Sequence, residues 1–254
     1  MTRYPEPLVP PDGVAPVPRR LRGMLAGAYV FQTTRALYVW EFPPYPQYYV
    51  PLADVAADVL VDEGRSKRTR RGTAAYAGLR VGAETRPGAV QVYGEDAPEP
   101  LRQTARFEWS ALDAWFEEDE QVFVHPRNPY ARCDVLRSGR PVRVEVEGVV
   151  LAEAASSVVL FETGLPPRYY LDRTALHQEH LVPSDTVTSC PYKGTTSAYW
   201  SARIGEQTHP DLAWSYAFPT VAMAPIAGLV AFYNEKVDLY VDGERQERPV
   251  TPFS

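Results

Sequence analysis

Hydrophobic and polar positions alternate along most of the chain in short runs that turn residues separate. Residues 142–147 read Val-Arg-Val-Glu-Val-Glu, and this period of two predicts a strand with one exposed face. Short apolar runs at 158–161 and 230–233 predict buried strands. Because 25 prolines and 16 glycines break the chain into short elements, and no strand–helix–strand rhythm appears, the pattern predicts a mainly β protein.

Only short segments of the chain show a pattern that predicts a helix. Asp172 can cap a short helix that runs to about Leu181 and ends before Pro183. Residues 54–60 are its expected counterpart in the first half of the chain. We therefore expect one short helix in each half.

The chain repeats itself with a shift of 121 residues. Residues 27–60 align with 148–181 without a gap, and six of these 34 positions are identical. Beyond a small insertion, Arg71-Gly72 meets Lys193-Gly194. Because the matches keep the same order along the chain, they predict a diverged tandem duplication.

The repeat predicts the division of the chain. We expect a Pro-rich tail over residues 1–22, a first β domain over 23–125, a linker over 126–141 and a second β domain over 142–254. Arginines along the linker could pair with the acidic run at 117–120 and pin the domains together. The alternative is a solvated linker, since exposed ion pairs contribute little.

Composition excludes some classes of function. The net charge of −6 does not favour nucleic acid or an anionic membrane as a partner. The longest apolar run, 221–232, contains Pro225 and is too short to span a bilayer. Without a signal-peptide pattern, a cytoplasmic location and two free thiols, Cys133 and Cys190, are the expectation.

Reactive side chains concentrate at 190–194, Cys-Pro-Tyr-Lys-Gly, which we expect to be the turn of a hairpin between 186–188 and 195–204. Lys193 could receive a phosphate or carboxylate there. If burial lowered its pKa, it could act as a base or nucleophile, and as a cation it could stabilise a Cys190 thiolate. The alternatives are a solvated lysine and an inert buried cysteine.

The first copy has a different sequence at this turn. It reads Arg68-Thr69-Arg70-Arg71-Gly72, so the glycine persists while the thiol and phenol do not. With Arg65 and Lys67 this becomes a basic cluster that is either a phosphate contact or a solvated face. The asymmetry between copies marks the second turn as the better candidate for function, because residues needed only for folding should persist in both.

Aromatic residues form the second candidate feature. Six of them, with polar groups at their tips, could line a small-molecule pocket or could be core residues of an aromatic-rich β domain. They are Tyr169, Tyr170, Tyr192, Trp200, Trp214 and Tyr216.

Metal and cofactor motifs do not occur. The four histidines and two cysteines show no paired-cysteine and no HExxH spacing, and His177 and His180 most simply lie on a solvated helix face. No phosphate loop, dinucleotide fingerprint or nucleophile elbow occurs. We therefore expect neither a metal nor a cofactor.

Together, the string at 190–194, Tyr169-Tyr170 before it, and 214–216 and 230–233 after it resemble family 427 of the domains of unknown function, which has also been labelled nucleotidyltransferase-like. The resemblance covers 142–242 strongly and 23–124 more weakly. It implies a β-tent fold, in which two antiparallel sheets lean together at a steep angle with a pocket at their junction. Proteins of similar fold bind zinc through paired cysteines or hold a ligand in an aromatic cage, and this chain lacks the cysteine pairs.

The sequence therefore predicts two tandem β-tent-like domains, of which the second binds a small polar or anionic ligand. Lys193 would supply charge, the aromatic residues the walls, and Cys190 a thiol at the edge of the pocket. Two alternatives stay open. One is an enzyme that uses Lys193 or Cys190, in a nucleotidyltransferase-like reaction, and the other is a scaffold that binds a protein partner.

Overall fold

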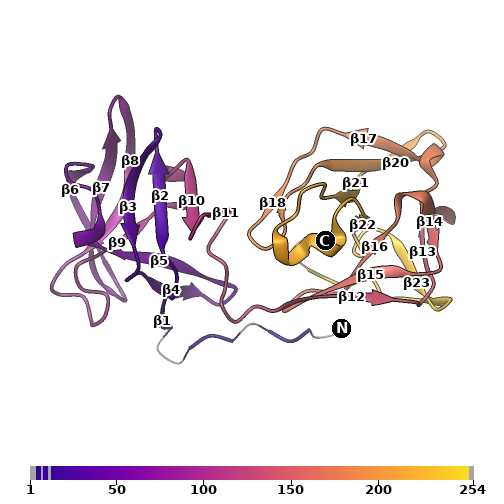
Figure 1. The fold of residues 1–254 in the computed structure, drawn as a ribbon, viewed down its shortest axis with the longest axis horizontal. Helices are drawn as coiled ribbons and strands as arrows, with labels where there is room; N and C mark the ends of the chain where they lie inside the picture. Colours follow the sequence, from indigo (N-terminus) through magenta and orange to yellow (C-terminus); the bar gives the residue numbers. More distant parts are fainter. Residues whose placement is uncertain (1–3, 7, 11–12, 252–254) are drawn as a thin grey trace. The chain divides into compact units, whose positions relative to one another are not determined.

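The computed structural model describes residues 4–6, 8–10 and 13–251. Residues 9–128 form one compact unit, and residues 129 onward form a second unit that also includes the described residues before Val9. Figure 1 colours the first domain indigo to magenta and the second magenta-orange to yellow. Each domain is built from antiparallel strands and very little helix.

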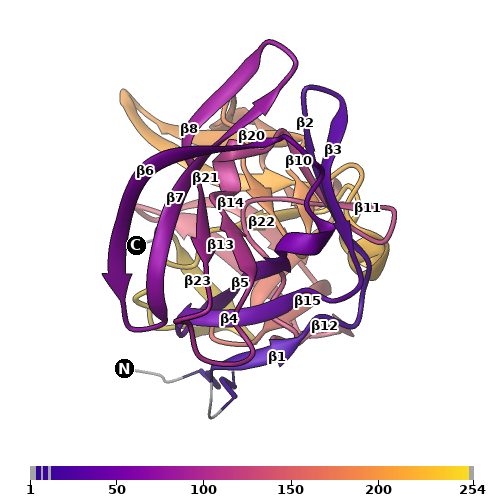
Figure 2. The same ribbon diagram turned by 90° about the vertical axis from the view of Figure 1, so that its left-hand side faces the viewer.

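The first domain contains a seven-stranded antiparallel sheet in the order β1-β4-β5-β9-β8-β7-β6 and a four-stranded one in the order β11-β10-β2-β3. Figure 2 shows this domain from its own side. The strands are β1 (Val14–Pro16), β2 (Leu21–Leu25), β3 (Ala28–Thr33), β4 (Leu37–Phe42), β5 (Tyr45–Pro51), β6 (Leu60–Thr69), β7 (Gly72–Val81), β8 (Glu84–Tyr93), β9 (Thr104–Phe107), β10 (Ala114–Glu117) and β11 (Glu120–Val122).

The second domain has the same two sheets. Its seven strands follow the order β12-β15-β16-β22-β21-β20-β17, and its four follow β14-β13-β23-β24. They are β12 (Cys133–Ser138), β13 (Val142–Val146), β14 (Val149–Ala154), β15 (Ser157–Glu162), β16 (Arg168–Leu171), β17 (Leu181–Ser184), β20 (Ala198–Ile204), β21 (Gln207–Ser215), β22 (Val230–Phe232), β23 (Asp238–Val241) and β24 (Glu244–Arg245). Two further strands, β18 (Ser189–Cys190) and β19 (Gly194–Thr195), pair only with each other.

The two domains are copies of one topology. Strand for strand, β1 corresponds to β12, β4 to β15 and β5 to β16, and the order of the remaining strands agrees as well. Even an isolated bridge recurs, between Phe31 and Val55 in the first domain and between Ala152 and Leu176 in the second. The predicted duplication and the predicted mainly β fold are therefore confirmed.

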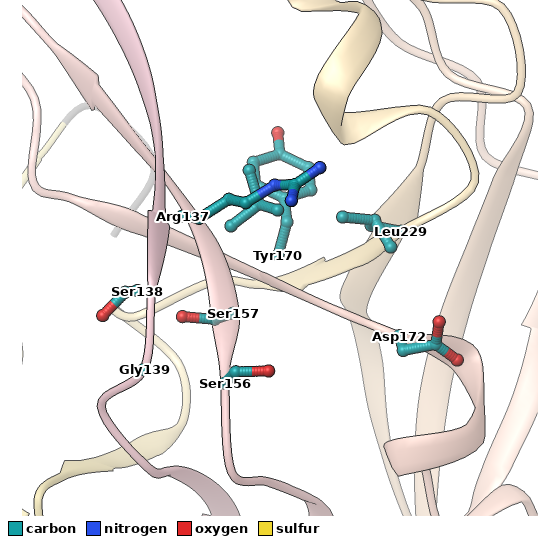
Figure 3. A pocket seen from close by; sticks show the side chains of 9 residues that line it. Arg137, Ser138, Gly139, Ser156, Ser157, Tyr170, Asp172 and Leu229 are labelled. Atoms are coloured by element: carbon teal, nitrogen blue, oxygen red, sulfur yellow. The ribbon is translucent and has the colours of Figure 1, made fainter.

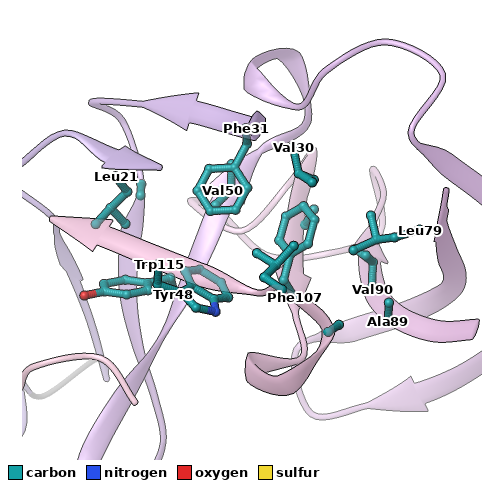
Figure 4. Close-up of a cluster of buried hydrophobic side chains, with 14 of the residues drawn as sticks. Leu21, Val30, Phe31, Tyr48, Val50, Leu79, Ala89, Val90, Phe107 and Trp115 are labelled. Atoms are coloured by element: carbon teal, nitrogen blue, oxygen red, sulfur yellow. The ribbon is translucent and has the colours of Figure 1, made fainter. Parts of the chain in front are cut away.

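A hydrophobic core fills the space between the two sheets of each domain. In the first domain Leu21 and Trp115 of the smaller sheet pack against Tyr48 and Phe107 of the larger one (Figure 4). In the second domain Val142 and its neighbours pack against the inner face of β20, β21 and β22. Apolar side chains therefore occupy the interior of both domains.

Two strands lie in segments for which the sequence predicts a tail and a linker. Strand β1 falls within the expected Pro-rich tail, and β12 falls within the expected linker. Both are edge strands, where proline and charged residues are tolerated because one row of backbone groups needs no partner. This composition made both strands resemble connecting chain.

Within the part of the chain that the structure describes, every helix is a short 3-10 turn. They are η1 (Leu52–Asp54), η2 (Trp109–Ala111), η3 (Arg173–Ala175), η4 (Gln178–His180) and η5 (Val221–Ile226). Asp172 caps η3 as predicted, since its side chain accepts a hydrogen bond from the Thr174 N–H at 2.9 Å. The predicted helix from Asp172 to Leu181 is nevertheless wrong, because Leu176 is extended and bridges to Ala152 between the two turns.

Among the described residues no helix has the length and hydropathy needed to cross a bilayer. The linker arginines pair locally. Arg127 contacts Glu117 and Glu120, while Arg140 contacts Asp242 of its own domain. These contacts stabilise each domain separately.

Candidate functional site

The outer face of the larger sheet of the second domain, the face turned away from the smaller sheet, carries most of the predicted site. One row of register partners crosses all seven strands on this face. From edge to edge the row reads Arg137, Val158, Tyr170, Ala231, Trp214, Tyr199 and Ser184. Side chains that lie far apart in the sequence are therefore neighbours here because strand pairing fixes their register.

Aromatic rings dominate the middle of this row. Tyr170, Trp214 and Tyr216 join one buried cluster with Tyr199 and with Met223 and Ile226 of η5, which covers the face. The Tyr170 and Trp214 rings meet edge to face with centroids 6.4 Å apart. This arrangement is typical of aromatic packing and makes the face rigid.

Lys193 reaches this face from the turn between β18 and β19. Its Nζ donates a hydrogen bond to Glu162 Oε2 at 2.5 Å, and both side chains are nearly buried, with 12% and 11% of their surface exposed. Thr220 holds the turn in place, because its N–H donates to the Lys193 carbonyl and its hydroxyl to the Tyr192 carbonyl. The 190–194 motif is thus anchored over the end of β15.

The charge state of Lys193 follows from this pair. Burial by itself lowers the pKa of the ammonium group, but the Glu162 carboxylate, with Cys190 and Tyr170 nearby, raises the pKa well above its ordinary value. Lys193 is therefore a protonated, ion-paired group. The net shift is thus opposite to the lowered pKa that a base or nucleophile would need, and the sequence did not reveal Glu162, which causes it.

The two cysteines are free thiols. Cys133 is the register partner of Glu162 on the edge strand, and Cys190 lies at the base of the Lys193 turn. Burial and the Glu162 carboxylate raise the pKa of the Cys133 thiol to about 12, against the opposing effect of Lys193. Cys133 is therefore a protonated structural thiol at neutral pH.

The Tyr170 hydroxyl is an unpaired polar group. The residue is 0% exposed, and its Oη has no hydrogen-bond partner among the described residues. The Trp214 indole is the neighbouring donor, but its contact with the phenol does not reach hydrogen-bond geometry. Burial raises the pKa of Tyr170 to about 12, so the hydroxyl is protonated and can both donate and accept a hydrogen bond.

In the first domain the hydroxyl of the equivalent tyrosine has a hydrogen-bond partner. Tyr49 takes the place of Tyr170 in the register, and its hydroxyl donates to Glu41, the counterpart of Glu162, at 2.9 Å. Arg106 replaces Ala231 in the same row and lies 3.4 Å from Glu41. Gln91 replaces Trp214. The first domain therefore pairs the tyrosine hydroxyl that the second domain leaves without a partner.

A cavity of about 370 Å³ reaches Tyr170 from the edge of the sheet. Figure 3 shows it between β12, β15 and the chain around Leu229. Its lining is Arg137, Ser138, Gly139, Ser156, Ser157, Val158, Tyr170, Asp172 and Leu229. The volume lies in the range of small-molecule sites.

The structure separates the predicted site residues into groups. Tyr170, Lys193, Trp214 and Tyr216 lie together at the outer face, and Tyr192 belongs to the turn above it. Tyr169 and Trp200 instead pack against the inner core, because neighbouring residues of a strand point to opposite faces. Of the predicted set, Tyr170 alone lines the 370 Å³ cavity.

The sequence analysis did not predict a buried ion pair that lies beside the aromatic cluster. Arg168 donates to both oxygens of Glu235 at 2.7 and 2.6 Å, and its guanidinium lies over the Trp214 ring, 5.7 Å from the centroid. Gln47 occupies the position of Arg168 in the first copy. This difference between the copies is a sequence signal that could have identified Arg168.

Three arginines of the basic cluster in the first copy have partners in the fold. Arg65 pairs with Glu63 and Arg68 with Asp96, while Arg71 donates to the Trp40 carbonyl. Within the described residues no group of three or more histidine, cysteine or acidic side chains is arranged to hold a metal ion.

Both domains match one protein family. The domain of unknown function DUF427 matches residues 13–118 and again residues 134–243. The chain belongs to this family. Each match covers the larger sheet and most of the smaller sheet of one domain, so the protein is a tandem pair of DUF427 domains. No curated protein matches the chain significantly.

Proposed function

We propose that the second DUF427 domain binds a small molecule at the outer face of its larger sheet, in the cavity that reaches Tyr170. The unpaired Tyr170 hydroxyl is the observation that carries this proposal. A buried polar group without a partner costs about 1–3 kcal/mol, so a ligand that pairs with it gains that free energy back.

The comparison between the copies supports a role beyond folding. Tyr49 occupies the same place in the same fold, yet its hydroxyl is paired with Glu41. A tyrosine needed for packing alone would keep the same pairing in both domains. The second domain exchanged the arginine and glutamine of this row for Ala231 and Trp214, which removes the alternative partners of Tyr170.

The predicted residues take defined roles in this proposal. Trp214 and Tyr216 form the rigid apolar wall around Tyr170. Lys193 holds Glu162 by its ion pair, so Glu162 cannot pair with Tyr170 as Glu41 pairs with Tyr49. Tyr192 belongs to the turn that Thr220 fixes above this face.

The rival hypothesis is an enzyme that uses Lys193 or Cys190 in a transfer reaction. Lys193 is protonated and paired with Glu162, so it cannot act as a base or nucleophile until that pair breaks. The pair therefore favours a binding function. Turnover across a panel of nucleotide substrates, abolished in Lys193→Met, would reverse this conclusion.

A thermal-shift screen of small polar fragments on the full chain tests the proposal. The variants are Tyr170→Phe and, as the matched control, Tyr49→Phe. Fragments that bind the cavity should raise the Tm of the wild type and of Tyr49→Phe, and should raise that of Tyr170→Phe by less. Equal shifts in all three proteins would contradict the proposed site.

A further inference from the structure

The cavity of the second domain is lined by groups of both charges, the guanidinium of Arg137 and the carboxylate of Asp172. From them we propose that its ligand is a zwitterion, a small molecule with an anionic group at one end and an ammonium or similar cationic donor at the other. This inference rests on the proposed function, which places a ligand in the cavity, and adds the chemistry of that ligand.

Arg137 supplies the positive charge. It extends from the edge strand β12 along the cavity and lies in front of Tyr170 (Figure 3). Among the described residues its guanidinium has no ion pair or hydrogen bond. Other arginines near this edge already form ion pairs, Arg132 with Asp134 and Arg140 with Asp242. A guanidinium without a partner is a natural site for a carboxylate or phosphate.

One buried hydroxyl adds to the polar lining. Tyr170 is 0% exposed and lines the cavity, and its oxygen has no partner within the described chain. Ser157 also lines the cavity, but its counterpart Ala36 belongs to the core between the sheets, so its side chain points to the inner face. The orphaned Tyr170 hydroxyl can donate to an anionic ligand, and it is the part of the lining that a solvated surface pocket would not contain.

Asp172 supplies the negative charge. Its Oδ1 accepts both bonds that cap η3, from the Thr174 N–H at 2.9 Å and the Thr174 hydroxyl at 2.7 Å. These bonds hold the pKa of the carboxyl below its ordinary value, so the group is ionised. Its second oxygen, Oδ2, has no partner in the described residues and can accept from a cationic donor.

The first domain keeps the tyrosine of this lining, as Tyr49, but has other residues in place of Arg137, Ser157 and Asp172. By register, Pro16 stands where Arg137 does, and Val17 and Ala36 stand for Ser138 and Ser157. Pro51 replaces Asp172 as the residue before the first 3-10 turn. The charged lining is therefore a property of the second copy and not of the DUF427 fold.

Titration calorimetry with probes of graded length tests the ligand class on the full chain. The zwitterions are γ-aminobutyrate, δ-aminovalerate and ε-aminocaproate, and the single-charge controls are butyrate and butylamine. At least one zwitterion should bind about tenfold more tightly than either control, because each added charge-assisted contact contributes about that factor.

Two variants connect the charges to the ends of the probe. In Arg137→Gln a zwitterion should bind no more tightly than butylamine. In Asp172→Asn a zwitterion should bind no more tightly than butyrate. Asparagine is as good a helix cap as aspartate, so η3 should remain intact. Arg203→Gln, an exposed substitution on β20, is the control and should change nothing.

The outcomes separate the two proposals. If the single-charge probes bind as tightly as the zwitterions, or if Arg137→Gln and Asp172→Asn leave the ratios unchanged, the zwitterion proposal is overturned. Neutral fragments that still depend on Tyr170 would then leave the binding function standing. If no fragment shows binding that depends on Tyr170, both proposals fall together.

Discussion

At the scale of single residues, one hydroxyl distinguishes the two copies. Tyr49 donates to Glu41, whereas Tyr170 is equally buried and has no partner. Without ligand, Tyr170→Phe should leave the free energy of unfolding unchanged or raise it, because the substitution removes an unsatisfied polar atom. Tyr49→Phe should lower the free energy by about 1.5–3 kcal/mol, since its bond goes to a carboxylate.

Denaturant unfolding of both variants measures this difference. A loss of stability in Tyr170→Phe as large as that in Tyr49→Phe would show that the Tyr170 hydroxyl is paired after all.

The ion pair between Lys193 and Glu162 is also a residue-scale feature. Lys193→Met should lower the free energy of unfolding by about 3–5 kcal/mol, because it leaves a nearly buried carboxylate without its cation. The double variant Lys193→Met, Glu162→Gln should recover most of this loss, since no charge then remains. Arg71→Met is the matched control in the first domain and should cost about 1 kcal/mol, the contribution of one hydrogen bond to Trp40.

A double-mutant cycle from denaturant unfolding gives the coupling directly. Additive losses for Lys193 and Glu162 would mean that the two side chains do not interact in solution.

At the scale of elements, the turn glycine was correctly predicted to belong to the fold. Gly72 and Gly194 have φ of +107° and +94°, in the region that favours glycine. Gly194→Ala should lower the free energy of unfolding by about 1–2 kcal/mol through backbone strain alone. Gly72→Ala should lower it further, because its new Cβ would lie 2.8 Å from the Ala97 Cα.

Thermal unfolding of the two variants gives the comparison. If Gly72→Ala loses no more stability than Gly194→Ala, the close approach to Ala97 is absent in solution.

The sequence predicted the elements unequally. Alternation identified strands such as β13, and the repeat predicted the tandem domains, because both signals depend on local periodicity. The edge strands β1 and β12 were missed, since proline and charge at an edge resemble a linker. The sequence analysis grouped Tyr169 and Trp200 with Tyr170, although they lie on the other face of the sheet. Composition does not reveal which face of a sheet a residue occupies, and only the pairing register shows it.

At the scale of the whole molecule, the second domain alone contains the buried Arg168–Glu235 pair. Burial pushes the pKa of Glu235 up, but hydrogen bonds from Arg168 and Thr251 lower it below its ordinary value of 4.5. The stabilisation is therefore complete above pH 4.5 and is lost as the pH falls through the lowered pKa.

Glu235→Gln should accordingly flatten the dependence of unfolding free energy on pH between about pH 5 and pH 3. Unfolding followed across this range, with the exposed substitution Glu206→Gln as control, provides the measurement. An unchanged slope in Glu235→Gln would show that this carboxyl does not contribute to acid sensitivity.

The candidate site was also only partly predictable. Comparing the copies identified the 190–194 turn and Trp214 as features of the second domain. It did not identify Glu162 as the partner of Lys193, or Arg137 and Ser157 as neighbours of Tyr170, because those contacts depend on strands far apart in the sequence. Such residues can be compared between the two copies once the strand register has aligned their larger sheets.

The central claim is that a ligand occupies the cavity of the second domain. A crystal structure of the full chain soaked with a fragment that shifts the Tm tests it most directly. The account predicts density in contact with the Tyr170 hydroxyl between Arg137 and Asp172. Density elsewhere on the chain, with this cavity empty, would contradict it.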